Sequence, residues 1–80
     1  MKIPRDLSGL QLAKALRALA YEIVRQEGSH LRLTTLRDGE HHITIPAHTP
    51  LKVGTLNSIL KQIAAHHQIS VGELLRLLDL

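Results

Sequence analysis

The stretch GSHLRLTT, residues 28–35, decides the fold of this chain. It opens at a glycine turn, and polar and apolar side chains then alternate. Because side chains along a strand alternate with a period of two, one face carries the polar positions His30, Arg32 and Thr34. The opposite face carries Leu31, Leu33 and Thr35. We therefore expect a strand with one face in the core and the other free for chemistry.

Residues 41–47 alternate in the same way and are expected to pair with this strand. A two-residue loop would pair every apolar position of one strand with a polar position of the other. Such a shift of register by one residue turns all the apolar side chains of a strand to the opposite face of the sheet. A three-residue loop over residues 37–39, with Gly39 in the left-handed conformation, pairs Leu33 with Ile43. We expect this second register. It also pairs Leu31 with Ile45, Arg32 with Thr44, Thr34 with His42, and His30 with Pro46.

A first strand is expected over residues 21–26, because this short segment ends at Glu27-Gly28-Ser29, a sequence typical of a tight turn. Its register stays open. Ile23 and Val24 are both apolar, so either parity agrees with the sequence.

Three segments have the period of an amphipathic helix. Ser8 and Gln11 have capping-box spacing and predict a helix over residues 9–19, after an extended lead-in at Met1–Leu7. Apolar residues at i, i+3, i+4 and i+7 predict a second helix from Gly54 or Thr55 to His66, after a linker at residues 48–50. Ser70 and Glu73 form a second capping box, which starts a short last helix.

The order helix, three-stranded antiparallel meander, helix and short helix predicts a single α+β domain over residues 1–80. We expect both longer helices to cover the face that carries Leu31, Leu33, Ile43 and Ile45. The opposite face of the sheet is then left open.

Composition limits the classes of function. The chain has 80 residues, no cysteine, one Tyr, no Phe or Trp, and a formal net charge of +3. A chain this short predicts a thin core and no roomy active site, and the lack of cysteine excludes disulfides and thiolate metal sites. No apolar run is long enough to span a bilayer, so we expect a soluble, cytoplasmic protein without a membrane partner. The positive charge favours a polyanionic or acidic partner, and the lack of aromatic residues excludes base-stacking platforms.

His30 is the leading candidate for chemistry, because histidine exchanges protons near neutral pH. Arg32, two residues along the strand, is placed to stabilise charge on a phosphate. Lys52, with the free amides near Gly54 and Thr55, forms a candidate phosphate site at a helix start. The alternative in both places is an ordinary solvated surface.

The other histidines are weaker candidates. His41 and His42 are adjacent on a strand and point apart, so they do not chelate one ion together. His66 and His67 are expected to be polar residues at a helix end, where positive charge suits the helix dipole. The sequence has no HExxH motif and no clustered carboxylates, so we expect no metal.

The chain strongly resembles the HicA-like (YcfA) toxin family of type II toxin-antitoxin systems over essentially its whole length. The residues that carry the resemblance are LQLAKALRALAYEIVRQEGSHLRL at 10–33, with Ser8-Gly9 just before it, HHITIPAH at 41–48 and PLKVGTLNSILKQ at 50–62. The resemblance implies a fold like a double-stranded-RNA-binding domain and cleavage of mRNA without a metal or other cofactor. It also implies catalysis by the histidine of a glycine-x-histidine turn, here His30 after Gly28 and Ser29. A HicB-type antitoxin is the implied partner.

These two lines of inference lead to one hypothesis, a metal-independent endoribonuclease in which the 2′-hydroxyl of the RNA is the nucleophile. His30 acts as general base or general acid, two roles that one sequence does not separate. The RNA-binding residues are expected to be Gly28, Ser29, Arg32, Lys52, Gly54 and Thr55. The alternative is a module of the same fold that binds RNA or an acidic protein without cleaving it.

Overall fold

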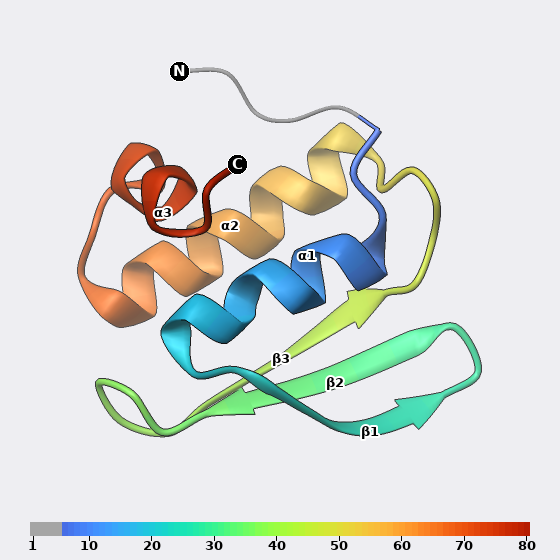
Figure 1. Ribbon diagram of the computed structural model, residues 1–80, viewed down its shortest axis with the longest axis horizontal. Helices are drawn as coiled ribbons and strands as arrows, with labels where there is room; N and C mark the ends of the chain where they lie inside the picture. Colours follow the sequence, from blue (N-terminus) through green and yellow to red (C-terminus); the bar gives the residue numbers. More distant parts are fainter. Residues whose placement is uncertain (1–5) are drawn as a thin grey trace.

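The computed structural model describes residues 6–80, so the predicted lead-in at Met1–Leu7 lies outside the described residues except for Asp6 and Leu7. The elements follow in the expected order (Figure 1). They are α1 (Gly9–Ala15), a 3-10 helix (Leu16–Leu19), β1 (Glu22–Glu27), β2 (His30–Thr35), β3 (His41–Pro46), α2 (Val53–His67) and α3 (Val71–Leu77). The α+β class predicted from the sequence is confirmed.

The three strands form one antiparallel sheet in the order β1-β2-β3. The β2–β3 register is the predicted one, since Leu33 pairs with Ile43 and His30 with Pro46. Gly39 has the expected positive φ of 98°, and Asp38 before it is also left-handed at 57°. The rule that polar positions pair with polar positions and apolar with apolar therefore predicted the register of this hairpin correctly.

The β1–β2 register, which the sequence left open, is irregular. Ile23 pairs with Leu33 and Arg25 with Arg32, so the register shifts between Ile23 and Arg25. Val24, at the shift, and Ile23 are both exposed. Neither parity applies along the whole strand, because the irregularity places two apolar residues in succession at the edge of the sheet.

The helix ends agree with the sequence signals to within two residues. Ser8 and Gln11 form the predicted capping box, and the Ser70 hydroxyl accepts a hydrogen bond from the Glu73 backbone N–H. The first predicted helix tightens into a 3-10 turn after Ala15. The second begins one residue before the earlier of the two predicted starts and ends one residue later than expected. No helix within residues 6–80 is long and apolar enough to cross a membrane.

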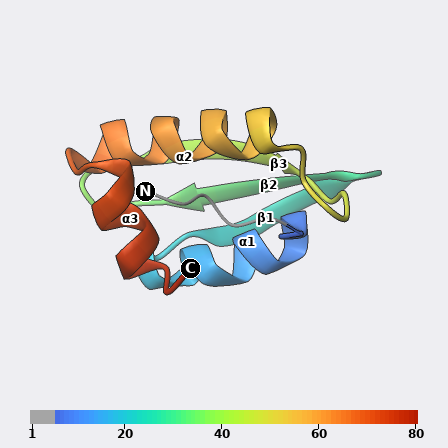
Figure 2. The ribbon, with the colours of Figure 1, turned by 90° about the horizontal axis from the view of Figure 1, so that it is seen from above.

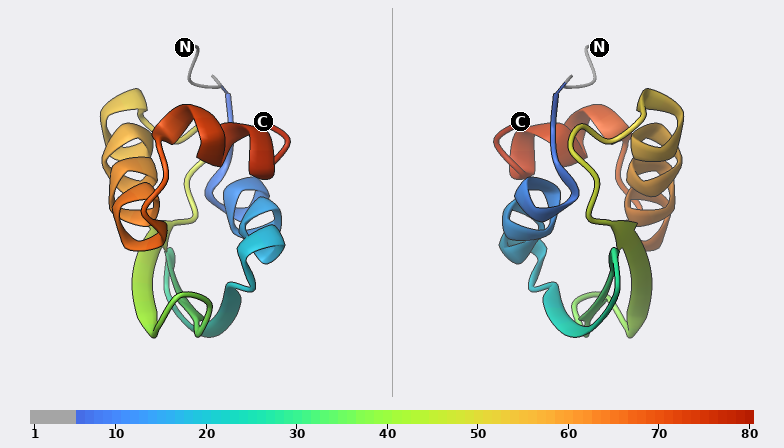
Figure 3. Two further views of the ribbon diagram at one scale, coloured as in Figure 1. Left: turned by 90° about the vertical axis from the view of Figure 1, so that its left-hand side faces the viewer. Right: turned by 90° about the vertical axis from the view of Figure 1, so that its right-hand side faces the viewer.

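Both longer helices lie on one side of the sheet, and the other face is open (Figures 1 and 3). Along β2 the burial alternates, with His30 and Arg32 exposed and Leu31 and Leu33 fully buried. Viewed from above, α2 runs along β3 while α1 lies on the side of β1 (Figure 2). The short α3 lies across from α2 to α1 at one end (Figure 3). Its buried residues Leu74 and Leu75 join the same hydrophobic core.

Gly9 holds the start of α1 against the end of β3. A Cβ at this position would lie 1.9 Å from the Pro46 carbonyl oxygen, and the Gly9 N–H donates to the His48 carbonyl oxygen at 3.0 Å. Only glycine allows this backbone approach without displacement. The contact therefore fixes the end of β3 that lies beside His30.

The end of the sheet away from His30 holds a network of titratable side chains. The Tyr21 hydroxyl lies 2.7 Å from His41 Nδ1 and 3.2 Å from His67 Nε2, and His67 Nδ1 lies 2.9 Å from Asp38 Oδ2. His66 stacks on His41 with ring centroids 4.4 Å apart. His66 and His67 do end α2 as predicted, but His67 is buried and forms part of the core rather than a polar helix end.

One arrangement of protons satisfies this network with neutral imidazoles. An ionised Asp38 only accepts, so His67 donates from Nδ1, and its Nε2 then accepts from the Tyr21 hydroxyl. The Tyr21 oxygen in turn accepts from His41 Nδ1. The hydrogen bond from His67 is the main cause that lowers the pKa of Asp38. Burial raises the pKa of Tyr21 to about 12, which keeps its hydroxyl protonated at neutral pH.

Candidate active site

The turn between β1 and β2 places His30 at the first position of β2. Glu27 pairs with His30 across this turn, and Gly28 within it has a φ of +54°, a conformation that favours glycine. The Ser29 carbonyl accepts a hydrogen bond from the Ala47 N–H at 2.6 Å. The turn is therefore tied to the end of β3, so the backbone at His30 is held from both neighbouring strands.

A shallow hollow on the open face of the sheet contains two of the predicted site residues. Its lining residues are Arg25, Glu27, His30, Arg32 and Thr44, and its volume is about 120 Å³. Two arginines therefore line the same hollow as His30. Arg25 also pairs with Glu27, with 2.6 Å between Arg25 Nε and Glu27 Oε1, but both side chains are largely exposed.

A second hollow begins at His30 and continues to α2. We call it the β3–α2 groove; it has a volume of about 450 Å³ and is lined by His30, Thr44, Pro46, Gly54, Thr55, Ser58, Ile59 and Gln62. The predicted residues Gly54 and Thr55 thus share a surface with His30. This neighbourhood was not readable from sequence spacing, because it depends on how α2 lies along β3.

Lys52 lies in an adjoining hollow rather than beside His30. That hollow is lined by Pro46, His48, Pro50, Leu51, Lys52 and Thr55, and it shares Pro46 and Thr55 with the β3–α2 groove. Lys52 is the N-cap of α2, and no side chain within residues 6–80 caps the first-turn amides. Free amides and a lysine at a helix start favour an anion. Lys52 and Arg32 therefore lie in two separate hollows, each of which shares lining residues with the β3–α2 groove.

Gly28 and Ser29 have a different place from the other predicted residues. Neither lines the three hollows around His30, and both serve to shape the turn that carries it. The hollows also contain polar residues that the sequence analysis did not propose for the site, among them Arg25, Ser58 and Gln62. The position of Arg25 in the hollow depends on the irregular β1–β2 register, and the positions of Ser58 and Gln62 depend on the packing of α2. No local sequence signal therefore identified these three residues.

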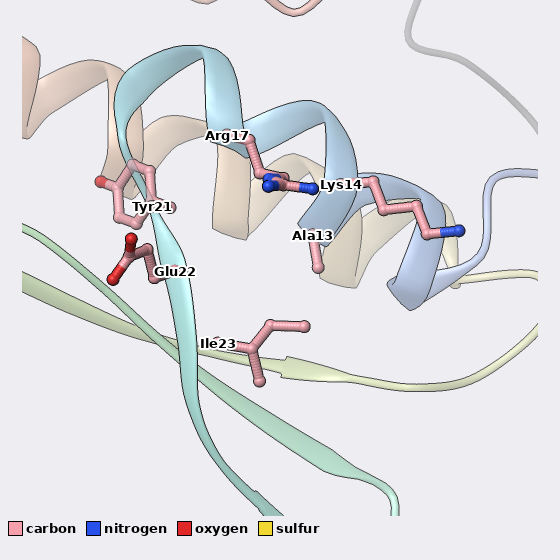
Figure 4. Close-up of a pocket in the computed structure, with 6 residues that line it drawn as sticks. All are labelled: Ala13, Lys14, Arg17, Tyr21, Glu22 and Ile23. Atoms are coloured by element: carbon pink, nitrogen blue, oxygen red, sulfur yellow. The ribbon is translucent and has the colours of Figure 1, made fainter.

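A further hollow lies between α1 and β1 (Figure 4). Lys14 extends from α1, Arg17 from the 3-10 helix that follows it, and Ile23 from β1, and the volume is about 320 Å³. His30 is not among its lining residues, which are Ala13, Lys14, Arg17, Tyr21, Glu22 and Ile23. Tyr21 is almost fully buried and its raised pKa keeps its hydroxyl protonated, and no histidine lines this hollow, so we do not place the chemistry here.

Within residues 6–80, the side chains of His30 and His48 make no hydrogen bond to another described residue, whereas those of His41, His42, His66 and His67 do. Of these two, His30 lines the hollow that contains Arg25 and Arg32, and His48 lines the hollow that contains Lys52. No group of three or more potential metal ligands gathers in the described part of the chain. The arrangement that remains is an exposed imidazole with arginines on one side and the start of α2 on the other. Such an arrangement can hold a phosphodiester and move a proton.

The fold and this surface define a small basic α+β domain whose open sheet face has an exposed histidine in hollows shared with two arginines and with the start of α2. A family model described as HicA toxin of bacterial toxin-antitoxin matches residues 9–64, which include every candidate site residue. The chain therefore belongs to the HicA toxin family and is the toxin of a toxin-antitoxin system. The helix α3 lies outside the matched residues. Comparison with curated proteins and comparison with solved structures found no match.

Proposed function

We propose that this toxin is a metal-independent endoribonuclease that cleaves mRNA with His30 as its single catalytic histidine. The observation that carries the proposal is the position of His30, exposed where the hollow with Arg25 and Arg32 meets the β3–α2 groove. RNA supplies its own nucleophile, the 2′-hydroxyl, so the protein has only to transfer protons and stabilise charge on the phosphate.

His30 acts in one of two ways in this reaction. As a base it accepts the proton of the 2′-hydroxyl, whose oxygen then attacks phosphorus. As an acid it donates a proton to the departing 5′-oxygen. In both cases solvent water donates or accepts the proton that His30 does not transfer, the P–O5′ bond breaks, and the products are a 2′,3′-cyclic phosphate and a 5′-hydroxyl. Arg32 stabilises the charge on the phosphate, while Lys52, Gly54 and Thr55 anchor the backbone of the strand.

Incubation of the purified protein with an unstructured RNA in excess EDTA tests this proposal. We expect cleavage with 2′,3′-cyclic phosphate ends, no cleavage of the same RNA with 2′-O-methyl riboses, and a rate that falls as salt rises, because counterions compete for Arg and Lys. RNA that is bound but intact would instead identify a non-catalytic binding module. Cleavage that requires a divalent ion would contradict the metal-free mechanism.

We propose further that a HicB-type antitoxin inhibits the toxin by covering this surface. Occlusion of His30 is the most direct form of inhibition, and acidic side chains on the antitoxin complement Arg32 and Lys52. Both cations border hollows that include or adjoin the His30 surface, so one partner of ordinary interface size reaches both.

The double substitution Arg32→Glu and Lys52→Glu tests occlusion, since it should weaken the binding of both RNA and antitoxin. The matched control is Lys14→Glu with Arg17→Glu, which reverses two cations at the α1–β1 hollow instead. Hydrogen exchange of the complex gives a second measurement. Unchanged exchange at residues 28–34 and 52–56 on antitoxin binding would contradict occlusion.

A further inference from the structure

We propose that the β3–α2 groove binds the nucleotide next to the scissile phosphate and that Gln62 and Ser58 select its base. This inference rests on the proposed function, because it takes the RNA to be bound across His30. It adds a binding site for a single unpaired base and two residues that determine specificity.

The groove has the size and position of such a site. Its volume of about 450 Å³ is in the range of small-ligand pockets, and His30 forms one end of it. The strand β3 contributes Thr44 and Pro46, and the exposed side of α2 contributes the opposite wall. A nucleotide in this groove therefore lies directly beside a phosphate held at His30.

The lining of the groove is neutral, whereas the two hollows that adjoin it contain cations. Apart from His30, its polar side chains are three hydroxyls and one amide: Thr44, Thr55, Ser58 and Gln62. Ile59, only 4% exposed, gives an apolar floor. Arg32 lies in the hollow that shares His30 and Thr44 with the groove, and Lys52 lies in the hollow that shares Pro46 and Thr55 with it. A single RNA strand has the same alternation, since neutral bases separate charged phosphates.

The type of recognition follows from the side chains that are present. The chain has no Phe or Trp, and its one Tyr is buried, so no Phe, Tyr or Trp ring is available to stack on the base. The polar side chains of the groove instead offer hydrogen bonds to the exposed edges of an unpaired base. The Gln62 amide provides a donor and an acceptor, and its one side-chain hydrogen bond to another residue within 6–80 is a long one, from Nε2 to Ser58 Oγ at 3.4 Å. An amide pairs in bidentate fashion with a base that presents a donor beside an acceptor, and adenine is the best match.

A selection experiment tests the proposal without requiring cleavage. Immobilised His30→Ala protein is incubated with a pool of short single-stranded RNAs of random sequence, and the retained RNAs are sequenced. We expect enrichment of one base, adenine, at one position. The enrichment should fall at least about fivefold when Gln62→Ala or Ser58→Ala is added.

Asn57→Ala is the matched control, because it removes an amide from the same helix at a position outside the groove lining. It should leave the enrichment unchanged. A pool without base enrichment, or an enrichment that survives both Gln62→Ala and Ser58→Ala, would overturn the proposal. A failure of the proposed catalytic function gives a different result. In that case the wild-type protein would bind the enriched RNAs through the same groove residues and leave them intact.

Discussion

The two ends of the sheet use histidine in opposite ways. At one end, His30 stands at the start of β2, near the N-terminus of α2, and its side chain makes no hydrogen bond to another described residue. At the other end, His41, His66 and His67 meet at the C-terminus of α2, and each makes a hydrogen bond within the protein. We call these the open end and the closed end.

The difference lies in which partners the nitrogens of the imidazoles have. At the closed end, Tyr21, Asp38 and two backbone carbonyls take up ring nitrogens, so those nitrogens contribute to folding and are not free for a substrate. At the open end the imidazole is exposed and flanked by arginines. A histidine count alone is therefore a poor guide to function in this chain, because hydrogen bonds within the protein already use the ring nitrogens at the closed end. The His48 side chain has no hydrogen bond to another described residue either, but it lines the hollow with Lys52 rather than the hollow with the two arginines.

The substitution His30→Ala should have the largest effect on activity and almost none on folding. General acid-base catalysis typically contributes about 10²–10⁴-fold in rate, so RNA cleavage should fall by at least about 100-fold. The exposed side chain contributes little to the core, and the free energy of unfolding should change by less than about 0.5 kcal/mol. Cleavage assays and urea unfolding measure the two quantities. A well-folded variant that cleaves RNA at the wild-type rate would remove His30 from the mechanism.

The substitution His67→Ala should show the reverse pattern. It leaves a cavity and removes the partner of both Tyr21 and Asp38, which should lower the free energy of unfolding by about 2–3 kcal/mol. Cleavage per folded molecule should stay the same. Tyr21→Phe is a milder companion, with an expected loss of about 1 kcal/mol. If His67→Ala impaired cleavage as strongly as His30→Ala without loss of stability, the division between the two ends would be wrong.

The pH dependence of stability should come from the closed end. Burial, followed by the neighbouring His66, His67 and His42, lowers the pKa of His41 below its ordinary value of 6.5. Below pH 6.5 the unfolded chain therefore takes up this proton before the folded protein does, and stability falls as the pH falls. Asp38 acts in the same direction at lower pH, because its pKa is also lowered, mainly by the hydrogen bond from His67.

Urea midpoints measured from pH 8 to pH 5 check this dependence. We expect a higher midpoint above pH 6.5 than below it, and a flatter profile for His41→Gln. The control His30→Ala should keep the wild-type slope, since the His30 side chain has no hydrogen bond to another described residue. Equal slopes for wild type and His41→Gln would show that the network does not set the pH response.

The sequence predicted the open end better than the closed end, for physical reasons. The position of His30 and its pairing with Pro46 follow from strand alternation and from a turn rule, both of which are local. The closed end joins Tyr21, Asp38, His41 and His67, which are up to 46 residues apart in the chain. Only the packing of α2 on the sheet brings them together. The preference of histidine for helix ends therefore predicted where His67 lies in the sequence of α2, but not that its side chain is buried. The same dependence on packing hid Ser58 and Gln62 from the sequence.

The smallest predicted effect distinguishes a backbone contact from a side-chain contact at the open end. Gly54 lies in the first turn of α2 and lines the groove, and a Cβ there would meet no atom of the protein within 4 Å. Gly54→Ala should therefore stabilise the fold by about 0.5 kcal/mol, because alanine loses less conformational entropy in a helix. If RNA approaches this backbone closely, as proposed, the added methyl group should also weaken RNA binding, by about threefold. Val53→Ala is the control: it also favours the helix, at an exposed neighbouring position, and should leave the affinity unchanged. Equal affinities for the two variants, measured by fluorescence anisotropy with a labelled RNA, would exclude close backbone contact at Gly54 and leave Lys52 as the anchor.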